Sequence, residues 1–218
     1  MRGMILAAGR GERMGKLTTH TPKPLLRAGD KLLIEYAIES FVKAGICDIV
    51  INVAYLADKI QKTIGNGSRY GVNIEYAVEH ERLETGGGIY NALPLLGKQP
   101  FVVMSSDVIT SYPFNRLPSD PMGLAHIVLV KNPPFHPEGD FGLRDPYVNF
   151  NARPKRNFSG IGVYRPELFM DCEPGFFPLS QILFPAIRSL QVTGEYYEGK
   201  WFNIGTPEQL NEFSAVVA

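Results

Sequence analysis

MILAAGRGERMGKLTTHTPKPLL, residues 4–26, is the stretch from which both the fold and a binding site can be predicted. Its first three residues are apolar and can form a buried strand, and the small residues that follow let the backbone bend and approach a ligand closely. A strand that runs into a glycine-bearing loop exposes backbone N–H groups at a sheet edge, where nearby cations complete an anion site. Four cations follow here within fourteen residues: Arg10, Arg13, Lys16 and Lys23. The stretch therefore predicts a phosphate-binding loop.

Two common phosphate-binding motifs do not fit this loop. A dinucleotide fingerprint, G-x-G-x-x-G, requires glycine where Met14 stands. A Walker A loop, G-x-x-x-x-G-K-[ST], requires glycine at Arg10 and a hydroxyl at Leu17. A lone Gly-x-Gly often only turns the chain, but here Arg13 and the segment Thr21-Pro22-Lys23-Pro24-Leu25 follow it. The two prolines restrict the backbone around the lysine between them and so help to orient its side chain.

Bulk composition narrows the class of protein. A chain of 218 residues suits one domain, or one domain with a smaller lobe. Lys plus Arg and Asp plus Glu both total 22, so we expect neither nucleic acid nor a membrane as a partner. Cys47 and Cys172 fit neither a disulfide framework nor a C-x-x-C metal site, which indicates a reducing compartment. The first residues enter a strand without a signal peptide, and no apolar run approaches the length of a membrane span, so we expect a cytoplasmic protein.

Strands and helices alternate along the first half of the chain. Apolar periodicity predicts helices over 34–42 and 56–64 and another after Gly86-Gly87-Gly88; strands are expected over 48–53, 72–77 and 101–104. This alternation predicts an α/β fold with a mostly parallel sheet, helices on both faces and ligands at the carboxyl ends of the strands. The opening loop, Glu79, the triple glycine and Asp107 each follow a predicted strand and should converge on one rim.

The second half has fewer local signals. Eight prolines interrupt residues 113–154, where the one clear strand is 125–130, and long connections of this kind often form lids or binding loops. A strand is expected over 158–164 and a helix over 179–190. Thr206-Pro207-Glu208-Gln209 predicts a final helix that opens with a capping box. We find no internal repeat and no second independent domain.

LAAGRGERM followed by TPKPLL resembles the signature of the sugar-1-phosphate nucleotidyltransferases, and the resemblance extends over essentially the whole chain. It implies a single-domain Rossmann-like fold in which residues 1–110 bind the nucleotide and 111–218 form a smaller sugar-phosphate lobe. Longer members often carry a C-terminal left-handed β-helix, which we do not expect here. LETGGGIYNALPLLG, GDF, FSGIGV and IGT are similar to phrases of the short N-acetylmuramate 1-phosphate uridylyltransferases of cell-wall recycling.

The resemblance also implies a set of catalytic residues. Lys23 matches the lysine that contacts phosphate groups near the reacting centre, and Arg13 matches the arginine that draws out the β- and γ-phosphates. Asp107 matches the principal Mg²⁺ ligand. The second ligand is normally an Asp in a Trp-x-Asp-x-Gly-Thr phrase, in which Asn203 stands here. An amide oxygen can coordinate Mg²⁺ without adding negative charge, so we expect weaker metal binding and reduced activity. Two alternatives stay open: a metal site that relies on Asp107 and the nucleotide alone, and a degenerate enzyme.

Further residues are expected to bind the two substrates. For the nucleotide these are Ala8, Gly9, Gly11, Glu79, Gly86 and Gly87; for the sugar phosphate they are Asp140, Gly142, Ser159 and Gly160. Lys155 or Arg156 could neutralise the acceptor phosphate, although a solvated charge run is the simpler interpretation.

The substrates that the resemblance implies are a nucleoside triphosphate and a sugar 1-phosphate, with Mg²⁺ as cofactor and a monomer or weak homodimer as the active form. UTP with N-acetylmuramate 1-phosphate is the first choice. GTP with mannose 1-phosphate and dTTP with glucose 1-phosphate are alternatives. A sensor that binds nucleotide or sugar phosphate without turnover is a further alternative, which Asn203 favours.

Overall fold

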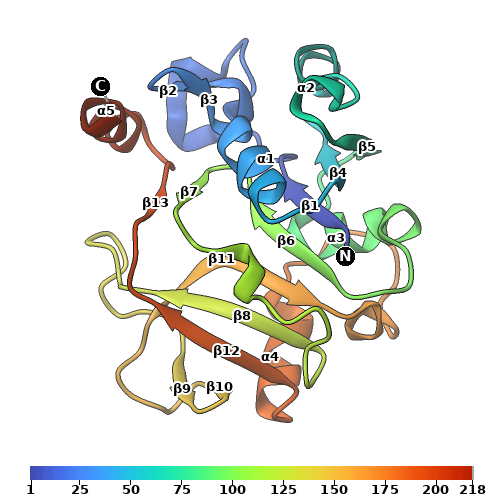
Figure 1. Cartoon of the computed structure of the whole chain (residues 1–218), viewed down its shortest axis with the longest axis vertical. Helices are drawn as coiled ribbons and strands as arrows, with labels where there is room; N and C mark the ends of the chain where they lie inside the picture. The colour runs from blue at the N-terminus through green and yellow to red at the C-terminus, as the bar shows by residue number, and fades with distance from the viewer. Residues whose placement is uncertain (218) are drawn as a thin grey trace.

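A nine-stranded sheet runs through the protein in the order β5-β4-β1-β6-β11-β8-β12-β10-β9 (Figure 1). The computed structural model describes residues 1–217. All strands except β11 and β10 run in the same direction, which follows from the pairing of each with its neighbour. The strands are β1 (Gly3–Leu6), β4 (Asp48–Val53), β5 (Asn73–Val78), β6 (Phe101–Ser105), β8 (Ala125–Val130), β9 (Gly142–Arg144), β10 (Tyr147–Asn149), β11 (Asn157–Tyr164) and β12 (Val192–Tyr197). The predicted α/β fold with a mostly parallel sheet is confirmed.

Helices cover both faces of this sheet, as predicted. Successive side chains of a strand point to opposite faces, so Ile5 packs with α1 (Leu33–Lys43) and α2 (Ala57–Ile64), while its neighbour Met4 packs with the other two helices. Those helices are α3 (Glu84–Leu96) and α4 (Ser180–Arg188). Because both faces are buried, the central strands are nearly continuous apolar runs.

The order of the strands reverses beside β1. The chain passes from β1 to β4 and β5 on one side and then returns through α3 to β6 on the other. The carboxyl ends of these four parallel strands therefore lie at one edge, with a switch point between β1 and β6. Open α/β sheets bind their ligands in the crevice at such a point.

The second half of the chain extends the same sheet. β11 pairs with β6 in antiparallel register, with Ile161 opposite Met104, and its pairing with β8 is irregular between Phe158 and Gly162. Within residues 113–154 the strand expected over 125–130 is observed as β8, and the remainder, expected to be irregular, contains the hairpin of β9 and β10. Two small sheets accompany the main one: β7 (Val108–Thr110) with β13 (Trp201–Asn203), and β2 (Arg27–Ala28) with β3 (Lys31–Leu32).

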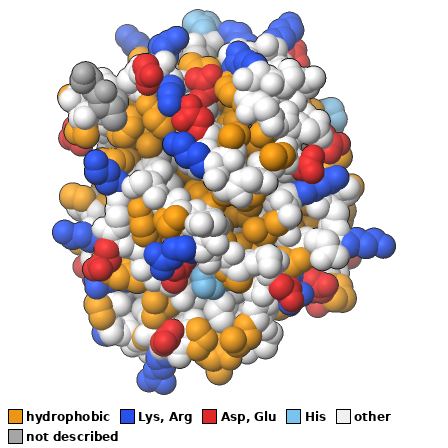
Figure 2. Space-filling model, in the orientation of Figure 1, with side chains coloured by type: hydrophobic (Ala, Val, Ile, Leu, Met, Phe, Trp, Pro, Cys, Tyr) orange, Lys and Arg blue, Asp and Glu red, His pale blue; other side chains and the backbone are white. Residues whose placement is uncertain are grey.

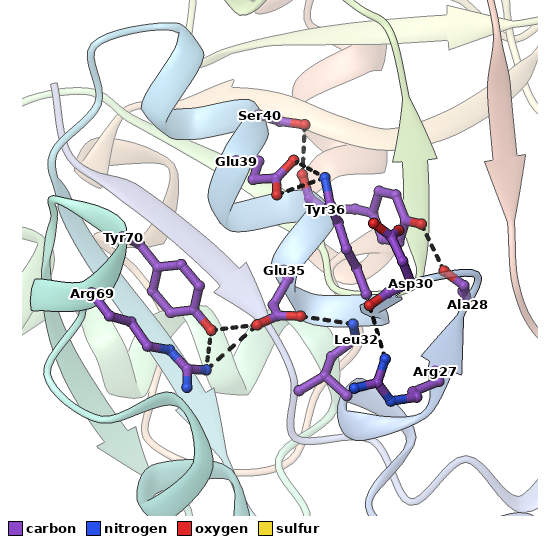
Figure 3. Close-up of polar contacts among 11 residues, drawn as sticks. Arg27, Ala28, Asp30, Leu32, Glu35, Tyr36, Glu39, Ser40, Arg69 and Tyr70 are labelled. Carbon is purple, nitrogen blue, oxygen red and sulfur yellow. Dashed lines mark hydrogen bonds and ion pairs between the residues drawn. The ribbon is translucent and has the colours of Figure 1, made fainter. Parts of the chain in front are cut away.

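Helix α1 is tied to its surroundings by polar contacts at its first turns (Figure 3). The Glu35 carboxylate accepts hydrogen bonds from the Leu32 N–H at 2.8 Å and from the Tyr70 hydroxyl at 2.7 Å. The Tyr36 hydroxyl donates to the Ala28 carbonyl at 2.6 Å. These bonds fix the β2–β3 hairpin, and with it the end of the opening stretch, against the body of the protein.

The last helix, α5 (Pro207–Val217), begins with the predicted capping box. The Gln209 side-chain oxygen accepts from the Thr206 N–H at 3.1 Å, and the Thr206 hydroxyl accepts from the Gln209 N–H at 3.4 Å. Leu210 and Phe213 pack against Met14, which is buried. The final helix therefore holds the loop that follows β1.

The sequence predicts a helix that begins after the triple glycine, and this prediction is wrong. Gly86, Gly87 and Gly88 lie in the first turns of α3, which begins at Glu84. Short 3₁₀ helices complete the fold: Glu12–Thr18, Lys23–Leu25, Ser68–Tyr70, Phe114–Arg116 and Pro166–Phe169. Of the helices described, none is long and apolar enough to cross a membrane. Basic and acidic side chains are intermixed on the face shown in Figure 2, as the balanced composition predicts.

Candidate active site

A cavity of about 710 Å³ opens at the carboxyl edge of the parallel strands. Its walls are the loop after β1, Lys23, the ends of β4 and β5, the first residues of α3 and the turn after β6. Seven of the residues predicted to be catalytic or to bind the nucleotide line it: Ala8, Gly9, Gly11, Arg13, Lys23, Glu79 and Asp107. The expectation that strand-end residues converge on one rim is therefore met for these positions.

The cavity contains an ion pair between Lys23 and Asp107. The Lys23 ammonium group contacts the Asp107 carboxylate, and the two side chains are 12% and 22% exposed. Gly11 sets the position of the lysine, because its φ of +67° suits glycine and a Cβ there would lie 2.8 Å from the Lys23 Cβ. A side chain at position 11 would displace the cation from the cavity wall.

The loop after β1 leaves an open backbone surface toward the cavity. A Cβ at Gly9 would meet no protein atom within 4 Å. Among the described residues, the N–H groups of Gly9 and Arg10 have no recorded hydrogen-bond partner. The Thr18 hydroxyl lies 3.0 Å from the Gly11 carbonyl and 3.1 Å from that of Gly15, which fixes the far side of the loop. The absent side chain and the free donors fit the close approach of an anionic ligand.

Arg13 extends from the same loop toward the end of β13. A Cβ at Gly205 would lie 3.0 Å from the Arg13 Nη2 atom, so the guanidinium lies directly over that backbone. Arg13 is exposed and lines both the large cavity and a smaller one beside it. Its charge is therefore available to an anion at the junction of the two.

Glu79 and Asn52 form a buried polar pair in the wall beyond β4 and β5. The Asn52 side-chain oxygen accepts from the Ala7 N–H at 2.9 Å, and its Nδ2 donates to Glu79 Oε1 at 2.6 Å. Burial raises the pKa of Glu79, while hydrogen bonds from Asn52 and from the Leu83 N–H oppose that rise. The sequence reasoning did not identify Asn52, although a lone amide within the buried run DIVINV was a usable signal.

The smaller cavity, of about 280 Å³, shares Leu6, Arg13, Thr85 and Ser105 with the large one. Two residues predicted to bind the sugar, Ser159 and Gly160, line it, and so does Asn203. Gly160 has a φ of +79°, within the irregular part of β11. The Ser159 carbonyl accepts from the Trp201 indole N–H at 2.9 Å, which links this strand to β13.

Two residues expected to bind the sugar line neither cavity. The Asp140 carboxylate accepts from the Phe158 N–H at 2.7 Å and lies 3.0 Å from His136 Nε2, so it holds the beginning of β11. Gly142 is buried, and a Cβ there would lie 2.2 Å from the Ala152 carbonyl oxygen. Its lack of a side chain is explained by strand packing.

Gly86 and Gly87 also lie outside both cavities. A Cβ at Gly86 would lie 2.5 Å from the Phe177 ring, and one at Gly87 would lie 2.1 Å from the Gly175 carbonyl oxygen. The segment before α4 therefore occupies the space that these glycines leave free. The sequence predicts nucleotide contacts at Gly86 and Gly87, and the structure instead shows protein packing there.

Asp107 and Asn203 are the residues predicted to hold a metal ion. Among residues 1–217, no three His, Cys, Asp or Glu side chains lie together in an arrangement that could hold a metal ion. Asp107 lines the large cavity and Asn203 the smaller one, and the two are linked by the backbone, where the Ile204 N–H donates to the Asp107 carbonyl at 2.9 Å. Mg²⁺ is commonly held by one or two carboxylates together with substrate phosphates and water. One carboxylate and one amide fit that pattern.

Comparison with known proteins agrees with this geometry. The profile of the nucleotidyl transferase family matches residues 2–153. An N-acetylmuramate α-1-phosphate uridylyltransferase from Neisseria meningitidis serogroup B is 44% identical over 99% of this chain and 98% of its own. A mannose-1-phosphate guanyltransferase from Hypocrea jecorina is 32% identical over 95% of this chain, which spans 62% of that longer protein.

Solved structures share the fold at lower identity. A putative glucose-1-phosphate thymidylyltransferase from Bacillus anthracis superposes with a TM-score of 0.87 at 21% identity, over 100% of this chain and 95% of the other. HddC from Yersinia pseudotuberculosis, complexed with GMP-PN, gives 0.82 at 20% identity, over 100% and 99% of the two chains. The matched profile and the relative of equal length together show that the chain belongs to the nucleotidyl transferase family and, within it, to the sugar-1-phosphate nucleotidyltransferases.

Proposed function

We propose that the protein transfers the uridylyl group of UTP to N-acetylmuramate 1-phosphate and releases pyrophosphate. The observation that carries this proposal is the junction of two cavities at Arg13 and Ser105, beside the ion pair of Lys23 and Asp107. A donor in the large cavity and an acceptor in the small one would meet there. The choice of UTP and N-acetylmuramate 1-phosphate rests on the relative that is 44% identical over nearly the whole of both chains.

In this reaction an acceptor phosphate oxygen attacks the α-phosphorus of the donor. A P–O bond forms there, the bond from that phosphorus to the α–β bridging oxygen breaks, and its electrons leave with pyrophosphate. Both reactants are anions, so their approach and the charge of the transition state must be stabilised by positive groups. Lys23 supplies charge at the reacting phosphate, and Arg13 binds the β- and γ-phosphates. The acceptor phosphate already carries the attacking negative charge, so no general base is required.

Backbone and side-chain groups of the large cavity orient the donor. Ala8, Gly9 and Gly11 offer backbone groups to the nucleotide, and Glu79 lies at the base. Glu79 follows β5 and Asp107 follows β6, three strand spacings away, or about 14 Å. A mononucleotide together with its hydrogen-bonding partners can bridge that span. We assign Gly86 and Gly87 a structural role, in which they allow α3 to pack closely against the segment before α4.

Ser159 and Gly160 are the residues that we assign to the acceptor. Most of the smaller cavity's lining comes from residues beyond 110, which supports the division into a nucleotide-binding half, 1–110, and a sugar-phosphate-binding half, 111–218. Ala218 lies outside the described residues. Asp140 and Gly142 support the walls of that half at a distance from the acceptor.

Mg²⁺ is the proposed cofactor. Asp107 would hold it with the amide oxygen of Asn203, and phosphate oxygens and water would complete its coordination. When bound, the ion supplies neutralisation of phosphate charge. We assign the reaction to the cytoplasm, since free cysteines at positions 47 and 172 suit a reducing compartment, and to a monomer or weak homodimer.

A pyrophosphate-release assay with Mg²⁺ tests the proposal. UTP, GTP, dTTP and CTP are each combined with N-acetylmuramate 1-phosphate, mannose 1-phosphate and glucose 1-phosphate. We expect UTP with N-acetylmuramate 1-phosphate to give the largest kcat/KM. A maximum for GTP with mannose 1-phosphate would instead indicate a guanylyltransferase. No release from any pair, with measurable nucleotide binding, would support the sensor that Asn203 favours.

A further inference from the structure

We propose that Asn52 engages one oxygen of Glu79 so that the carboxylate presents a single acceptor to the nucleobase, which favours uracil over guanine. The inference deepens the proposed function, on which it rests for the position of the base. It concerns a residue that neither contacts the reacting atoms nor follows a strand. Asn52 is a positioning residue within β4.

The orientation of the Asn52 amide is fixed by its partners. The Ala7 N–H can only donate, so the atom 2.9 Å away must be the side-chain oxygen of Asn52. The amide NH₂ group therefore points to Glu79 Oε1, at 2.6 Å. Asn52 is 3% and Glu79 7% exposed, so water does not compete strongly for this bond. The Asn52 amide therefore links Ala7, at the beginning of the loop after β1, to Glu79, the residue that we assign to the nucleobase.

Helix α3 closes the other side of the pair. A Cβ at Gly88 would lie 2.7 Å from Glu79 Oε1 and 2.8 Å from Asn52 Nδ2. The third glycine of the triple therefore leaves just enough room for the two polar atoms and prevents the Glu79 side chain from moving away. Glu79 Oε1 is enclosed between an amide donor and a helix backbone.

The bases differ in the donors that they offer to such a group. Guanine presents N1–H and the N2 amino group side by side, and a free carboxylate can accept from both with its two oxygens. Uracil presents one donor, N3–H, between two carbonyl oxygens. Asn52 donates to Oε1, helix α3 encloses that atom, and the Leu83 N–H also donates to the carboxylate. Glu79 therefore offers the cavity one oxygen, Oε2, which matches the single donor of uracil and leaves a guanine donor unpaired. An unpaired buried polar group is the kind of penalty by which sites reject a near analogue.

The test compares Asn52→Ser with Asn91→Ser. Asn91 lies exposed on α3 outside both cavities and serves as the matched control. We measure kcat and KM for UTP and GTP with one acceptor, and the binding of UDP and GDP by calorimetry. Asn52→Ser should lower the ratio of kcat/KM for UTP to kcat/KM for GTP about tenfold, mainly through KM. The reason is that the hydrogen bond from Asn52 that orients the Glu79 carboxylate is lost. Asn91→Ser should leave that ratio unchanged.

Gly88→Ala provides a second variant that keeps both polar side chains but compresses them. It should lower the same ratio, with the larger effect on the KM for UTP. A folded Asn52→Ser protein with the wild-type ratio would overturn the inference, and so would tighter binding of GDP than of UDP by the wild type. Failure of the proposed function has a different signature: no pyrophosphate is released from UTP, while the preference for UDP over GDP in binding still falls in Asn52→Ser. If the substituted proteins do not fold, the wild-type comparison of UDP with GDP still decides.

Discussion

The ammonium group of Lys23 and the carboxylate of Asp107 contact each other across the wall of the large cavity, although they are 84 positions apart in the chain. Each keeps the other ordered in the cavity where we propose that the reaction takes place. A group that neutralises phosphate charge contributes most when it is already in position, because the site then needs little rearrangement during the reaction. The pairing therefore places a cation beside the carboxylate that we propose as the metal ligand.

Lys23→Met should lower kcat about 10²–10³-fold, the range found when a single preorganised stabilising group is removed. The substitution retains most of the side-chain length, so the fold should persist. Steady-state rates of pyrophosphate release give the comparison, and thermal unfolding verifies that the variant is folded. Lys16→Met is the control, since Lys16 is an exposed cation of the same loop outside both cavities. Equal rates for the two variants would contradict the role of Lys23.

Gly11→Ala should reduce activity more strongly than Gly15→Ala. Gly11 lies in the left-handed helical region (φ +67°, ψ +37°), where a side chain costs about 1 kcal/mol. Gly15 (φ +58°, ψ −130°) lies in a region that glycine adopts far more readily than other residues, so substitution there carries at least as much backbone strain. Only at Gly11 does the added Cβ approach Lys23, whereas at Gly15 it meets nothing within 4 Å. The difference in kcat between the variants measures the displacement of Lys23. If both lose activity to the same extent, strain alone is responsible.

Asn203→Asp should raise the apparent affinity for Mg²⁺, because a second carboxylate adds charge to a hard-cation site. Turnover at low Mg²⁺ should increase with it. The measurement is kcat as a function of Mg²⁺ concentration at saturating substrates. No gain in affinity or in turnover would show that position 203 does not bind the metal. Asn203 would then serve only as part of the lining of the smaller cavity.

His126 should make the free energy of unfolding depend on pH below neutrality. Its Nδ1 lies 2.9 Å from the Thr193 hydroxyl, and burial lowers its pKa below 6.5, against a smaller opposite effect of Glu195. The unfolded chain therefore binds a proton near pH 6.5 that the folded chain does not, and stability falls as the pH decreases from there to the folded pKa. Urea unfolding at pH 7, 6 and 5 should show a steeper loss for the wild type than for His126→Gln. Parallel pH dependences would contradict this.

The first half of the fold could be predicted because its signals are local. The helix expected over 34–42 is observed as Leu33–Lys43, and the strand over 48–53 is observed at those residues. Apolar periodicity and runs of β-branched residues are sufficient to predict a helix or a strand whose apolar face is recognisable within its own sequence. β12, β13 and the β9–β10 hairpin were not expected. They are short or contain glycine and half-buried aromatic residues. β10, β12 and β13 are each specified by pairing with a strand distant in the chain.

The same distinction holds for the site. Strand-end reasoning brought the opening loop with Arg13, Glu79 and Asp107 to one cavity, because parallel strands share their carboxyl edge. Lys23 was expected there from the family resemblance. It could not place Gly86 or Gly142, since a glycine permits close approach of a ligand and close packing of backbone equally well. Asn52 was missed because its role depends on Ala7 and Glu79, which are distant in sequence and adjacent only across strands.

The ladder that joins β6 to β11, with Phe101 opposite Tyr164 and Met104 opposite Ile161, sets the spacing between the two halves. The regions that we propose for donor and acceptor are carried on one continuous sheet, in which main-chain hydrogen bonds set their separation. A bisubstrate compound that tethers a nucleoside to a hexose through a linker of matching length would meet a preorganised receptor. The first binding event should then bring the second group close to its own subsite, so that tether length, rather than the affinity of either half, becomes the main variable in inhibitor design.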